Sequence, residues 1–484
     1  MRALVRAHPV RLCAVALFAL YAAVSLTRHL VGWTGGYDLG IFTEAVRGYA
    51  SFGAPIADLK GWDYHLLGDH FHPILVVLVP AFWLWPSPAV LLVAQAALVA
   101  WSAAVVGRFA VDRLGRRAGL AVLTGYGLSF GVLFTVLFDF HEVAFAAPLT
   151  ALACVALAEG RWRAAVAWSL LLLLVKEDFG LTVAAVGVYL FLRRQRFLGA
   201  AVAVVGLTVQ VLVVLVALPY FNPHGTFDYW GVFGGSSGSD PGAGQLLTIL
   251  GELPKRLVWP PVKLGTLVVT FGITAFVALR SPLVLLAVPT LVWRFLGGKP
   301  DYWGLDMHYS LVLMPVVFLA AVDAVLRLRG SARPAAHTWA RWSLRVIPIV
   351  GLLPLVAGSV IGLGGQYPLP STAHQRAVAE VVAQVPDGAR VAATNRVAPQ
   401  LAARARVALY PRDLAGADWV LVDSQRPTHF CDVRAQLDLL AKLPTSGYRL
   451  VDQRDGVFLY RRGAGALSVP ASTCESALAP ARHG

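Results

Sequence analysis

Asp38 and four short polar clusters interrupt long apolar stretches, and their residue types suit acid–base and anion-binding chemistry. Asp38 stands among apolar neighbours in YDLGIF, and the segment WDYHLLGDHFHP carries Asp69, His70 and His72. A carboxylate can remove the proton of an attacking hydroxyl, and a nearby cation can stabilise an anionic leaving group. These four residues are therefore candidates for a catalytic or binding site.

The remaining clusters lie further along the chain and mix acidic with basic side chains in the same way. They occur in the segments FDFHE, VKED and GGKPDYWGLDMHYS, and Arg294 shortly precedes the last of these. Ionisable residues are costly to place in apolar surroundings, which makes them candidates for function. The residues concerned are Asp139, His141, Glu142, Lys176, Glu177, Asp178, Arg294, Lys299 and His308.

Each polar cluster also has a purely structural interpretation. Asp38 suits the N-cap of the helix that follows it, and acids near 139–142 favour the positive end of a helix dipole. The cluster at 69–72 can be a solvated loop, and 176–178 can be a self-neutralising turn. Several clusters on one side of a membrane favour a shared cavity over independent caps.

The same mixture of Asp, His and Glu suits a divalent cation such as Mg²⁺ or Mn²⁺, which takes carboxylate oxygens and imidazole nitrogens. The candidate ligands are Asp139, His141 and Glu142, although no HExxH spacing is present. The sequence contains no P-loop, dinucleotide fingerprint or GxSxG elbow. These absences argue against a nucleotide-driven pump and against an α/β-hydrolase.

The composition predicts a polytopic membrane protein. Of the 484 residues, 57% are hydrophobic and 14% are charged, and the mean hydropathy is +0.65. Soluble domains contain about 45–50% apolar and roughly 25% charged residues. This contrast excludes an ordinary cytoplasmic enzyme, a disordered protein and a compact nucleic-acid binder.

The elements that position the clusters are apolar helices, and the expected fold is an all-α membrane bundle of about eleven spans. We interpret the apolar run at 73–85 as a surface or re-entrant segment. The predicted spans are about 12–30, 88–108, 118–137, 142–159, 163–176, 178–193, 197–219, 262–279, 282–297, 308–326 and 343–363.

The net charge of +14 is explained by arginines in the loops on one side of the membrane rather than by nucleic-acid binding. With these spans, arginines gather in alternate loops, as the positive-inside rule requires, and acidic residues gather in the others. We therefore expect a plasma-membrane protein with a cytoplasmic N-terminus. All the polar clusters then face outward.

Two extracytoplasmic parts are expected in addition to the transmembrane domain at 1–365. The first outside loop, about 31–87, has apolar Phe42, Ala45 and Val46 opposed by Glu44 and Arg47, a pattern typical of an interfacial helix. Residues 366–484 predict a small α/β domain, with helices at 372–385 and 431–443 and strands in RVAAT, DWVLVD, YRLVD and GVFLYRR. A flexible linker is expected at 234–244.

Cys431 and Cys474 belong to this outer domain. Outside the cell they would meet an oxidising compartment, in which two cysteines can form a disulfide. The sequence leaves open whether these two pair.

Several of these segments resemble a known multipass family, domain of unknown function 2079. The resemblance is carried by YDLGIF, GDHFHP, FDFHE and LLLLVKED, followed by PDGARVAATN and ADWVLVD in the C-terminal part. More distantly, the layout is similar to the GT-C glycosyltransferases, which use polyprenyl-phosphate-linked sugars. By that resemblance, Asp38 matches the acid of the first outside loop that serves as general base, although Leu39 stands where such loops often carry a second acid.

The GT-C resemblance implies transfer of a sugar from a polyprenyl-phosphate donor to a glycan, lipid or protein acceptor of the envelope. Asp38 would be the base, with Asp139 and Glu142 as further catalytic candidates. Arg294, Lys299 or a metal would stabilise the leaving phosphate, and the remaining candidates would bind substrate. Two alternatives stay open, namely a transporter of a polar or anionic solute and a non-catalytic envelope assembly factor. Covalent product formation separates the first function from both alternatives.

Overall fold

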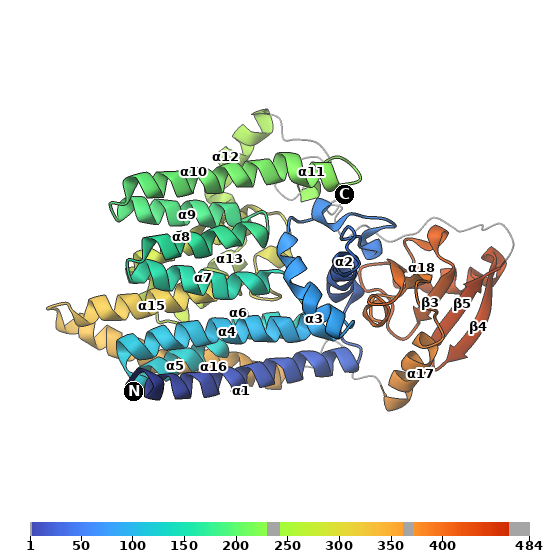
Figure 1. Ribbon diagram of the computed structural model, residues 1–484, viewed down its shortest axis with the longest axis horizontal. Coiled ribbons are helices and arrows are strands. Elements are labelled where there is room, and N and C mark those ends of the chain that lie inside the picture. The colour runs from blue at the N-terminus through green and yellow to red at the C-terminus, as the bar shows by residue number, and fades with distance from the viewer. Residues whose placement is uncertain (1, 230–242, 362–370, 464–484) are drawn as a thin grey trace.

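The computed structural model describes residues 2–229, 243–361 and 371–463. A bundle of helices and a smaller C-terminal domain lie at opposite ends of the long axis (Figure 1). The first helix, α1 (Arg2–Leu30), begins at the end of the bundle away from the C-terminal domain. Arg113 near the end of α4 (Ala89–Leu114) pairs with Glu159 after α7 (Val143–Ala158), so charged residues gather at that same distal end.

The bundle is built from apolar helices of unequal length. Four of those in the described residues are long and apolar enough to cross a membrane, namely His8–Leu30, Ala89–Leu114, Arg116–Leu137 and Arg196–Phe221. The total of about eleven spans and their orientation stay predictions. The helices that follow α1 in the bundle are α4 (Ala89–Leu114), α5 (Arg116–Gly127), α6 (Phe130–Leu137), α7 (Val143–Ala158), α8 (Trp162–Leu171), α9 (Phe179–Leu192), α10 (Arg196–Leu212), α11 (Leu218–Phe221), α12 (Ala243–Val258), α13 (Val262–Gly272), α14 (Val288–Leu296), α15 (Leu313–Arg329) and α16 (Pro334–Ile361).

Among the predicted spans that are interrupted in the structure are 262–279 and 282–297. The segment 262–279 is helical as α13 only to Gly272, after which Ala275 and Phe276 adopt positive φ angles that an α-helix does not allow. The segment 282–297 begins as a 3₁₀-helix, Pro282–Ala287, before it becomes α14. These breaks shorten the regular helices next to the loop that carries His308.

The first outside loop contains short helices between the bundle and the C-terminal domain. The apolar segment at 73–85 forms a 3₁₀-helix, Pro73–Leu78, and then α3 (Val79–Leu84), which packs near α2 (Ile41–Ala50) (Figure 1). Trp83 and Leu84 of this segment are exposed. The segment is thus a short surface element and not a long helix.

The first turn of the polar face of α2, at Thr43 and Glu44, does not face water, which corrects the expectation of an interfacial helix with a solvated polar side. Thr43 and Glu44 are fully buried. The Glu44 carboxylate accepts hydrogen bonds from the backbone amides of Leu59 and Val407, at 3.1 and 3.0 Å. The C-terminal domain therefore covers the face that the sequence pattern assigned to solvent.

The C-terminal domain is a mixed five-stranded sheet with the order β2-β1-β3-β5-β4. β1 pairs in parallel with β2 and β3, whereas β5 pairs antiparallel with β3 and β4. The predicted strands and helices are present, and β2 is an additional strand that the sequence did not reveal. The elements are α17 (Thr372–Val382), β1 (Arg390–Ala393), β2 (Arg406–Leu409), β3 (Trp419–Asp423), α18 (Val433–Lys442), β4 (Tyr448–Arg454) and β5 (Val457–Arg462).

Three sequence expectations fall outside the described residues. They are the domain boundary at 365/366, most of the linker at 234–244, and Cys474, the proposed partner of Cys431. The pairing of these two cysteines stays a prediction.

Polar contacts attach the C-terminal domain to the first outside loop. Arg406 donates two hydrogen bonds to the buried carboxylate of Asp58, at 2.8 and 2.7 Å. Trp62 donates to the carbonyl oxygen of Asp413, and Arg412 donates to that of Leu59. A forked guanidinium–carboxylate contact fixes orientation as well as distance, so the loop and the domain are held in one arrangement.

Candidate functional site

Asp38 lies in a tight turn between α1 and α2, at the junction of the bundle with the C-terminal domain. The turn is a π-helical segment, Gly36–Gly40, and its amides at Gly36 and Tyr37 donate to the backbone and side-chain oxygens of Asn395. A Cβ atom on Gly36 would stand 2.5 Å from that of Ala398. Only glycine therefore fits at position 36, where the turn approaches Ala398. The Asp38 side chain itself is 33% exposed.

His141 is the nearest described partner of Asp38. Its Nε2 atom lies 3.3 Å from Oδ1 of Asp38. Its other nitrogen, Nδ1, lies 3.3 Å from the carbonyl oxygen of Asp139, which can only accept. A histidine with acceptors at both nitrogens is satisfied as an imidazolium. Burial lowers the pKa of His141, but its hydrogen bond to Asp38 and the charge of Asp38 outweigh this and raise it.

His308 stacks on the other side of His141, with the ring centroids 3.7 Å apart. Burial and the neighbouring charge of His141 hold the pKa of His308 well below its usual value. The two rings therefore differ in charge, since a second imidazolium beside the first would be repelled. Gln95 holds the assembly from α4, because its side-chain oxygen accepts from the His141 amide at 3.0 Å.

Asp139 supports the turn that carries Asp38. Its Oδ2 atom accepts a hydrogen bond of 2.6 Å from the amide of Gly35. Burial and the charge of Asp38 raise its pKa to about 6, although the Gly35 amide and the charges of Arg28 and Arg396 oppose this. Asp139 therefore lies next to Asp38 but contacts backbone.

Lys176 and Glu142 form a buried ion pair of 2.9 Å. Burial alone would raise the pKa of Glu142, but the Lys176 charge lowers it to about 2. Glu177, the next residue after Lys176, accepts from His70 at 2.6 Å and from the amide of Phe71 at 3.1 Å. These contacts connect the loop before α9 with the first outside loop.

A second group of charges centres on Asp69, which pairs with Lys60 at 3.0 Å and accepts from the hydroxyl of Tyr229 at 3.0 Å. Lys299 lies over the Tyr229 ring, with its ammonium 5.8 Å from the centroid. Burial and the charge of Lys60 lower the pKa of Lys299. Two ammonium groups thus lie close to one carboxylate.

His72 belongs to the wall of the site and not to its charged groups. Its ring meets that of Phe42 edge-on, at 5.6 Å. Burial lowers its pKa to about 4, so it is neutral at physiological pH.

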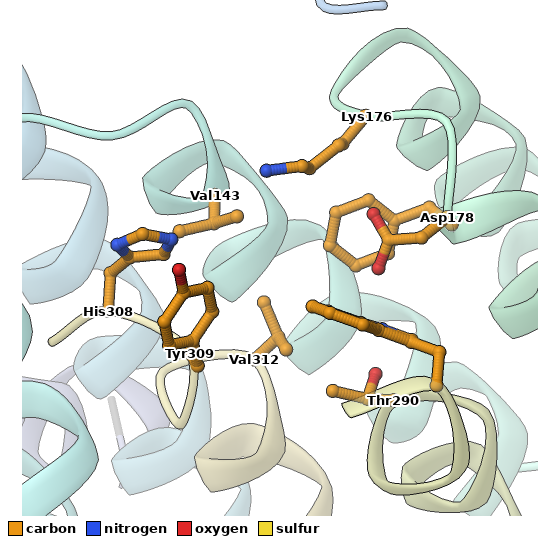
Figure 2. A pocket seen from close by; sticks show the side chains of 9 residues that line it. Val143, Lys176, Asp178, Thr290, His308, Tyr309 and Val312 are labelled. Atoms are coloured by element: carbon orange, nitrogen blue, oxygen red, sulfur yellow. The ribbon is translucent and has the colours of Figure 1, made fainter. Parts of the chain in front are cut away.

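A small pocket with a cavity volume of about 20 Å³ lies between the loop before α9 and the loop before α15 (Figure 2). Lys176 and Asp178 extend into it from the first loop, and His308 and Tyr309 extend from the second. Burial raises the pKa of Asp178 to about 6. The lining residues are Val143, Lys176, Asp178, Phe179, Thr290, Trp293, His308, Tyr309 and Val312.

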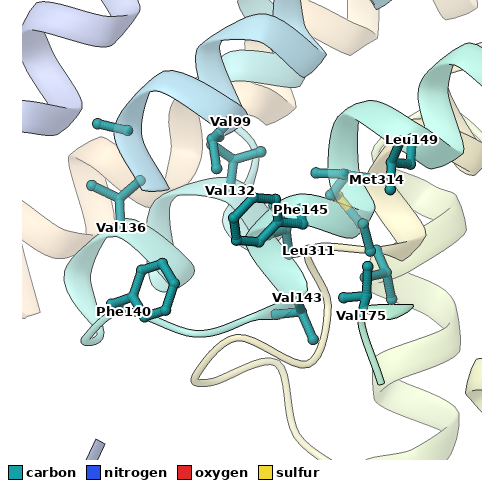
Figure 3. Close-up of a cluster of buried hydrophobic side chains, with 14 of the residues drawn as sticks. Val99, Val132, Val136, Phe140, Val143, Phe145, Leu149, Val175, Leu311 and Met314 are labelled. Carbon is teal, nitrogen blue, oxygen red and sulfur yellow. The ribbon is translucent and has the colours of Figure 1, made fainter. Parts of the chain in front are cut away.

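Apolar packing beneath the site fixes the loops that carry these residues (Figure 3). Phe140 and Val143, which flank His141 and Glu142, are buried in the main core, as is Val175 next to Lys176. Close packing of this kind leaves little freedom for the polar side chains between the anchors.

Arg294, expected to bind substrate, instead holds the loop before α15. It is fully buried and donates to the carbonyl oxygens of Tyr302, Gly304 and Tyr309 and to the hydroxyl of Ser310. Its donors are therefore directed at the protein itself.

The three candidate metal ligands do not converge. Within the described residues, no group of three or more His, Cys, Asp or Glu side chains is arranged to hold a metal ion. Asp139 points to the Gly35 amide, His141 to Asp38, and Glu142 to Lys176. Mg²⁺ or Mn²⁺ therefore has no ligand set in this cluster.

The sequence reasoning overlooked several residues of the site. Lys60, Gln95, Tyr229 and Trp293 lie in segments without an obvious motif, and only their tertiary contacts reveal them. Asn395 could have been noticed, because it ends the PDGARVAATN segment.

Comparisons with known proteins agree with this architecture. The family model of predicted membrane proteins DUF2079 matches residues 28–459. None of the curated proteins matches the sequence.

Solved structures show where the fold occurs. ArnT from Cupriavidus metallidurans bound to undecaprenyl phosphate matches with a TM-score of 0.52 at 15% identity, over 92% of this chain and 98% of that one. The apo form of the same ArnT matches with a TM-score of 0.49 at 13% identity, over 93% of this chain and 98% of that one. A third match is the oligosaccharyltransferase AglB from Archaeoglobus fulgidus in complex with an inhibitory peptide and a dolichol-phosphate. Its TM-score is 0.40 at 12% identity, over 93% of this chain and 74% of that one. The match to the lipid-bound ArnT shows a shared fold.

Proposed function

We propose that this chain, which belongs to the DUF2079 family of predicted membrane proteins, transfers a sugar from a polyprenyl-phosphate donor to an acceptor of the cell envelope. The observation that carries the proposal is the placement of Asp38. Its partly exposed carboxylate lies beside His141, whose ring stacks on that of His308, and at the junction with the C-terminal domain. The ArnT-like fold supports the same chemistry.

Asp38 acts as the general base in this proposal. The acceptor hydroxyl gives its proton to the Asp38 carboxylate while its oxygen forms a bond to the anomeric carbon of the sugar. The bond from that carbon to the phosphate oxygen breaks, and polyprenyl phosphate leaves with the bonding electrons. His141 orients the carboxylate by holding one of its oxygens, which leaves the other for the acceptor.

The leaving phosphate needs a cation because it departs as an anion. Lys60, which pairs with Asp69, and Lys299, which lies over the Tyr229 ring, supply it in this proposal. Lys176 is already paired with Glu142, and Arg294 is directed at backbone carbonyls. Asp139 and Glu142 position the turn of Asp38 and the ammonium of Lys176.

The C-terminal domain would provide the acceptor side of the site. Asn395 contacts the turn of Asp38, so the domain borders the base directly. The domain would lie outside the plasma membrane, because basic residues gather in the loops at the opposite end of the bundle and such loops stay in the cytoplasm.

The test is donor turnover by the purified full-length protein in liposomes. A panel of undecaprenyl-phosphate sugars is offered with envelope glycolipid extract, and released undecaprenyl phosphate and glycosylated product are measured. We expect both products from the wild type and from Asp306→Asn, a control that removes an exposed acid from the loop before α15. We expect Asp38→Asn to lose about a hundredfold or more in rate.

Full turnover by a folded Asp38→Asn protein would overturn the assignment of the base. Flux of the sugar lipid or of another polar solute without any covalent product would replace the transferase with the transporter. Both variants are checked by size-exclusion chromatography and thermal unfolding, so that loss of activity is not loss of fold.

A further inference from the structure

We propose that the outer edge of the C-terminal domain binds an acidic glycan polymer of the cell envelope through a row of arginines on β4 and β5. The arginine row consists of Arg449, Arg461 and Arg462, and Trp419 of β3 lies beside it. Sugar transfer plays no part in this binding, so the inference goes beyond the proposed function and is independent of it.

Two of these arginines lie directly opposite each other in the sheet. The register of β4 and β5 pairs Arg449 with Arg461, and both side chains are exposed. Paired residues of antiparallel strands project from the same face, with Cβ atoms about 4.5–5.5 Å apart, and like charges in such a pair destabilise the sheet. An anion bound between the two guanidinium groups would remove their repulsion, so this pair indicates a negatively charged partner.

Within the described residues, no acidic side chain forms an ion pair with the arginine row. The remaining arginine of β4, Arg454, differs because it pairs with Glu380 and Asp452. Asp418 is close to the row, since its carbonyl oxygen accepts from the backbone amide of Arg462, but their side chains form no ion pair. The charges of the row are therefore available to a partner.

Trp419 holds Arg461 in position. The two residues are paired across β3 and β5, and the guanidinium of Arg461 lies 5.4 Å from the centroid of the half-buried indole. A guanidinium that already rests on an aromatic ring loses less freedom when it binds a ligand. Arg461 is thus oriented in advance for the forked hydrogen bonding that a guanidinium makes to a carboxylate or a phosphate.

The position of the row favours an extended polymer over a membrane surface. β4 is the edge strand on the side of the domain away from the helical bundle (Figure 1). Lipid headgroups would lie on the side of the bundle, whose helices cross the membrane. The opposed arginines lie on adjacent strands, about 4.8 Å apart. A glycan with repeated carboxylates or phosphates can contact neighbouring arginines at once, which a single small anion cannot do along the whole row.

The test measures polymer binding to the full-length protein in nanodiscs of zwitterionic phosphatidylcholine. The probes are polygalacturonate, which carries carboxylates, dextran phosphate, which carries phosphates, and unmodified dextran. We expect at least one acidic polymer to bind and unmodified dextran not to bind. Because salt screens exposed charges, the affinity for the acidic polymer should fall about tenfold or more between low and high ionic strength.

A double variant, Arg449→Gln with Arg461→Gln, removes the opposed pair. We expect it to bind the acidic polymer about tenfold or more weakly than the wild type. The control is Arg376→Gln with Arg434→Gln, which removes two exposed arginines from α17 and α18 and leaves the row intact. The control has the same net charge as the first variant and should bind as the wild type does.

Thermal unfolding without polymer gives a second measurement and shows that the variants are folded. Arg449→Gln alone should unfold at a higher temperature than the wild type at low salt, because the repulsion from Arg461 is relieved. The difference should vanish at high salt. Equal unfolding temperatures at low salt would contradict the repulsion from which the anionic partner is inferred.

The binding results distinguish the remaining explanations. Failure of both acidic polymers to bind, or equal binding of unmodified dextran, would overturn the proposal. Equal losses in the two double variants would show that binding follows net charge and not the arginine row. Binding to vesicles that contain phosphatidylglycerol, without binding to either acidic polymer, would replace the glycan with a membrane surface. None of these results affects the proposed function, which is tested by release of undecaprenyl phosphate.

Discussion

The Nε2 atom of His141 lies 3.3 Å from the Oδ1 atom of Asp38, although the two residues are far apart in the chain. Because the other ring nitrogen faces a carbonyl oxygen, both nitrogens of His141 have an acceptor, and this arrangement favours the imidazolium. A carboxylate held by an imidazolium keeps one orientation, and a fixed orientation is what a general base needs.

Replacing His141 by glutamine should slow transfer by about a hundredfold, because the Asp38 carboxylate loses its orienting partner. We expect little change in KM for the acceptor. Since the pKa of His141 is raised, the pair is present at lower pH and is lost as pH rises through that value. The wild-type rate should therefore fall on the alkaline side.

The pH dependence is the readout that a merely structural role would not change. His141→Gln should lack the alkaline decline, whereas His337→Gln, at the start of α16, should keep the wild-type profile. An identical alkaline decline in wild type and His141→Gln would contradict the role of the imidazolium.

Asp139→Asn should stabilise the protein at neutral pH. Burial raises the pKa of Asp139 to about 6, above its ordinary value of 3.8. The stability that this protonated group contributes is complete below 3.8 and is lost as pH rises through 6. Asparagine mimics the protonated form and can still accept from the Gly35 amide. The difference should reach up to about 3 kcal/mol above pH 6 and vanish at acidic pH.

Thermal unfolding in detergent at a series of pH values measures this difference. Asp139→Ala is the second variant, because it removes the contact to Gly35 as well and should destabilise at every pH. An Asp139→Asn protein that is less stable than wild type at neutral pH would show that the negative charge itself is required.

Arg294→Met should destabilise the protein by about 3 kcal/mol or more, because one buried and two partly buried carbonyl groups lose their donor. Arg294→Lys should not restore stability, since a single ammonium cannot reproduce the guanidinium fork. Arg280→Met, at an exposed arginine, is the matched control. A stable Arg294→Met protein with impaired donor binding would return Arg294 to the substrate-binding residues.

Glu44→Gln should loosen the C-terminal domain. Both carboxylate oxygens accept from buried amides, Leu59 and Val407, and glutamine offers only one acceptor. The amide left without a partner costs about 1–3 kcal/mol. Limited proteolysis should release the C-terminal domain sooner from this variant than from the wild type or from Glu252→Gln, which changes an exposed glutamate. Equal release from all three would show that Glu44 does not hold the domain.

Most local structure was predictable because it follows from periodicity and composition. The strands at 390–393 and 419–423 and the helix at 433–442 follow the predicted segments. β2, Arg406–Leu409, was missed because it directly follows the alanine- and arginine-rich run LAARA, whose composition favours a helix. The solvated side of α2 was mispredicted because its covering partner, Val407, lies far along the chain.

The site shows the same division. The polar clusters and the membrane character of the chain were determined by the sequence, because an ionisable residue within an apolar run is visible from the neighbours alone. The tertiary structure decided which charged side chains form pairs and which contact backbone groups. Lys176 pairs with Glu142, Arg294 holds carbonyls, and His141 reaches Asp38. Electrostatic and hydrogen-bonded partners depend on distances of a few ångströms between remote segments, and sequence spacing carries no record of those distances.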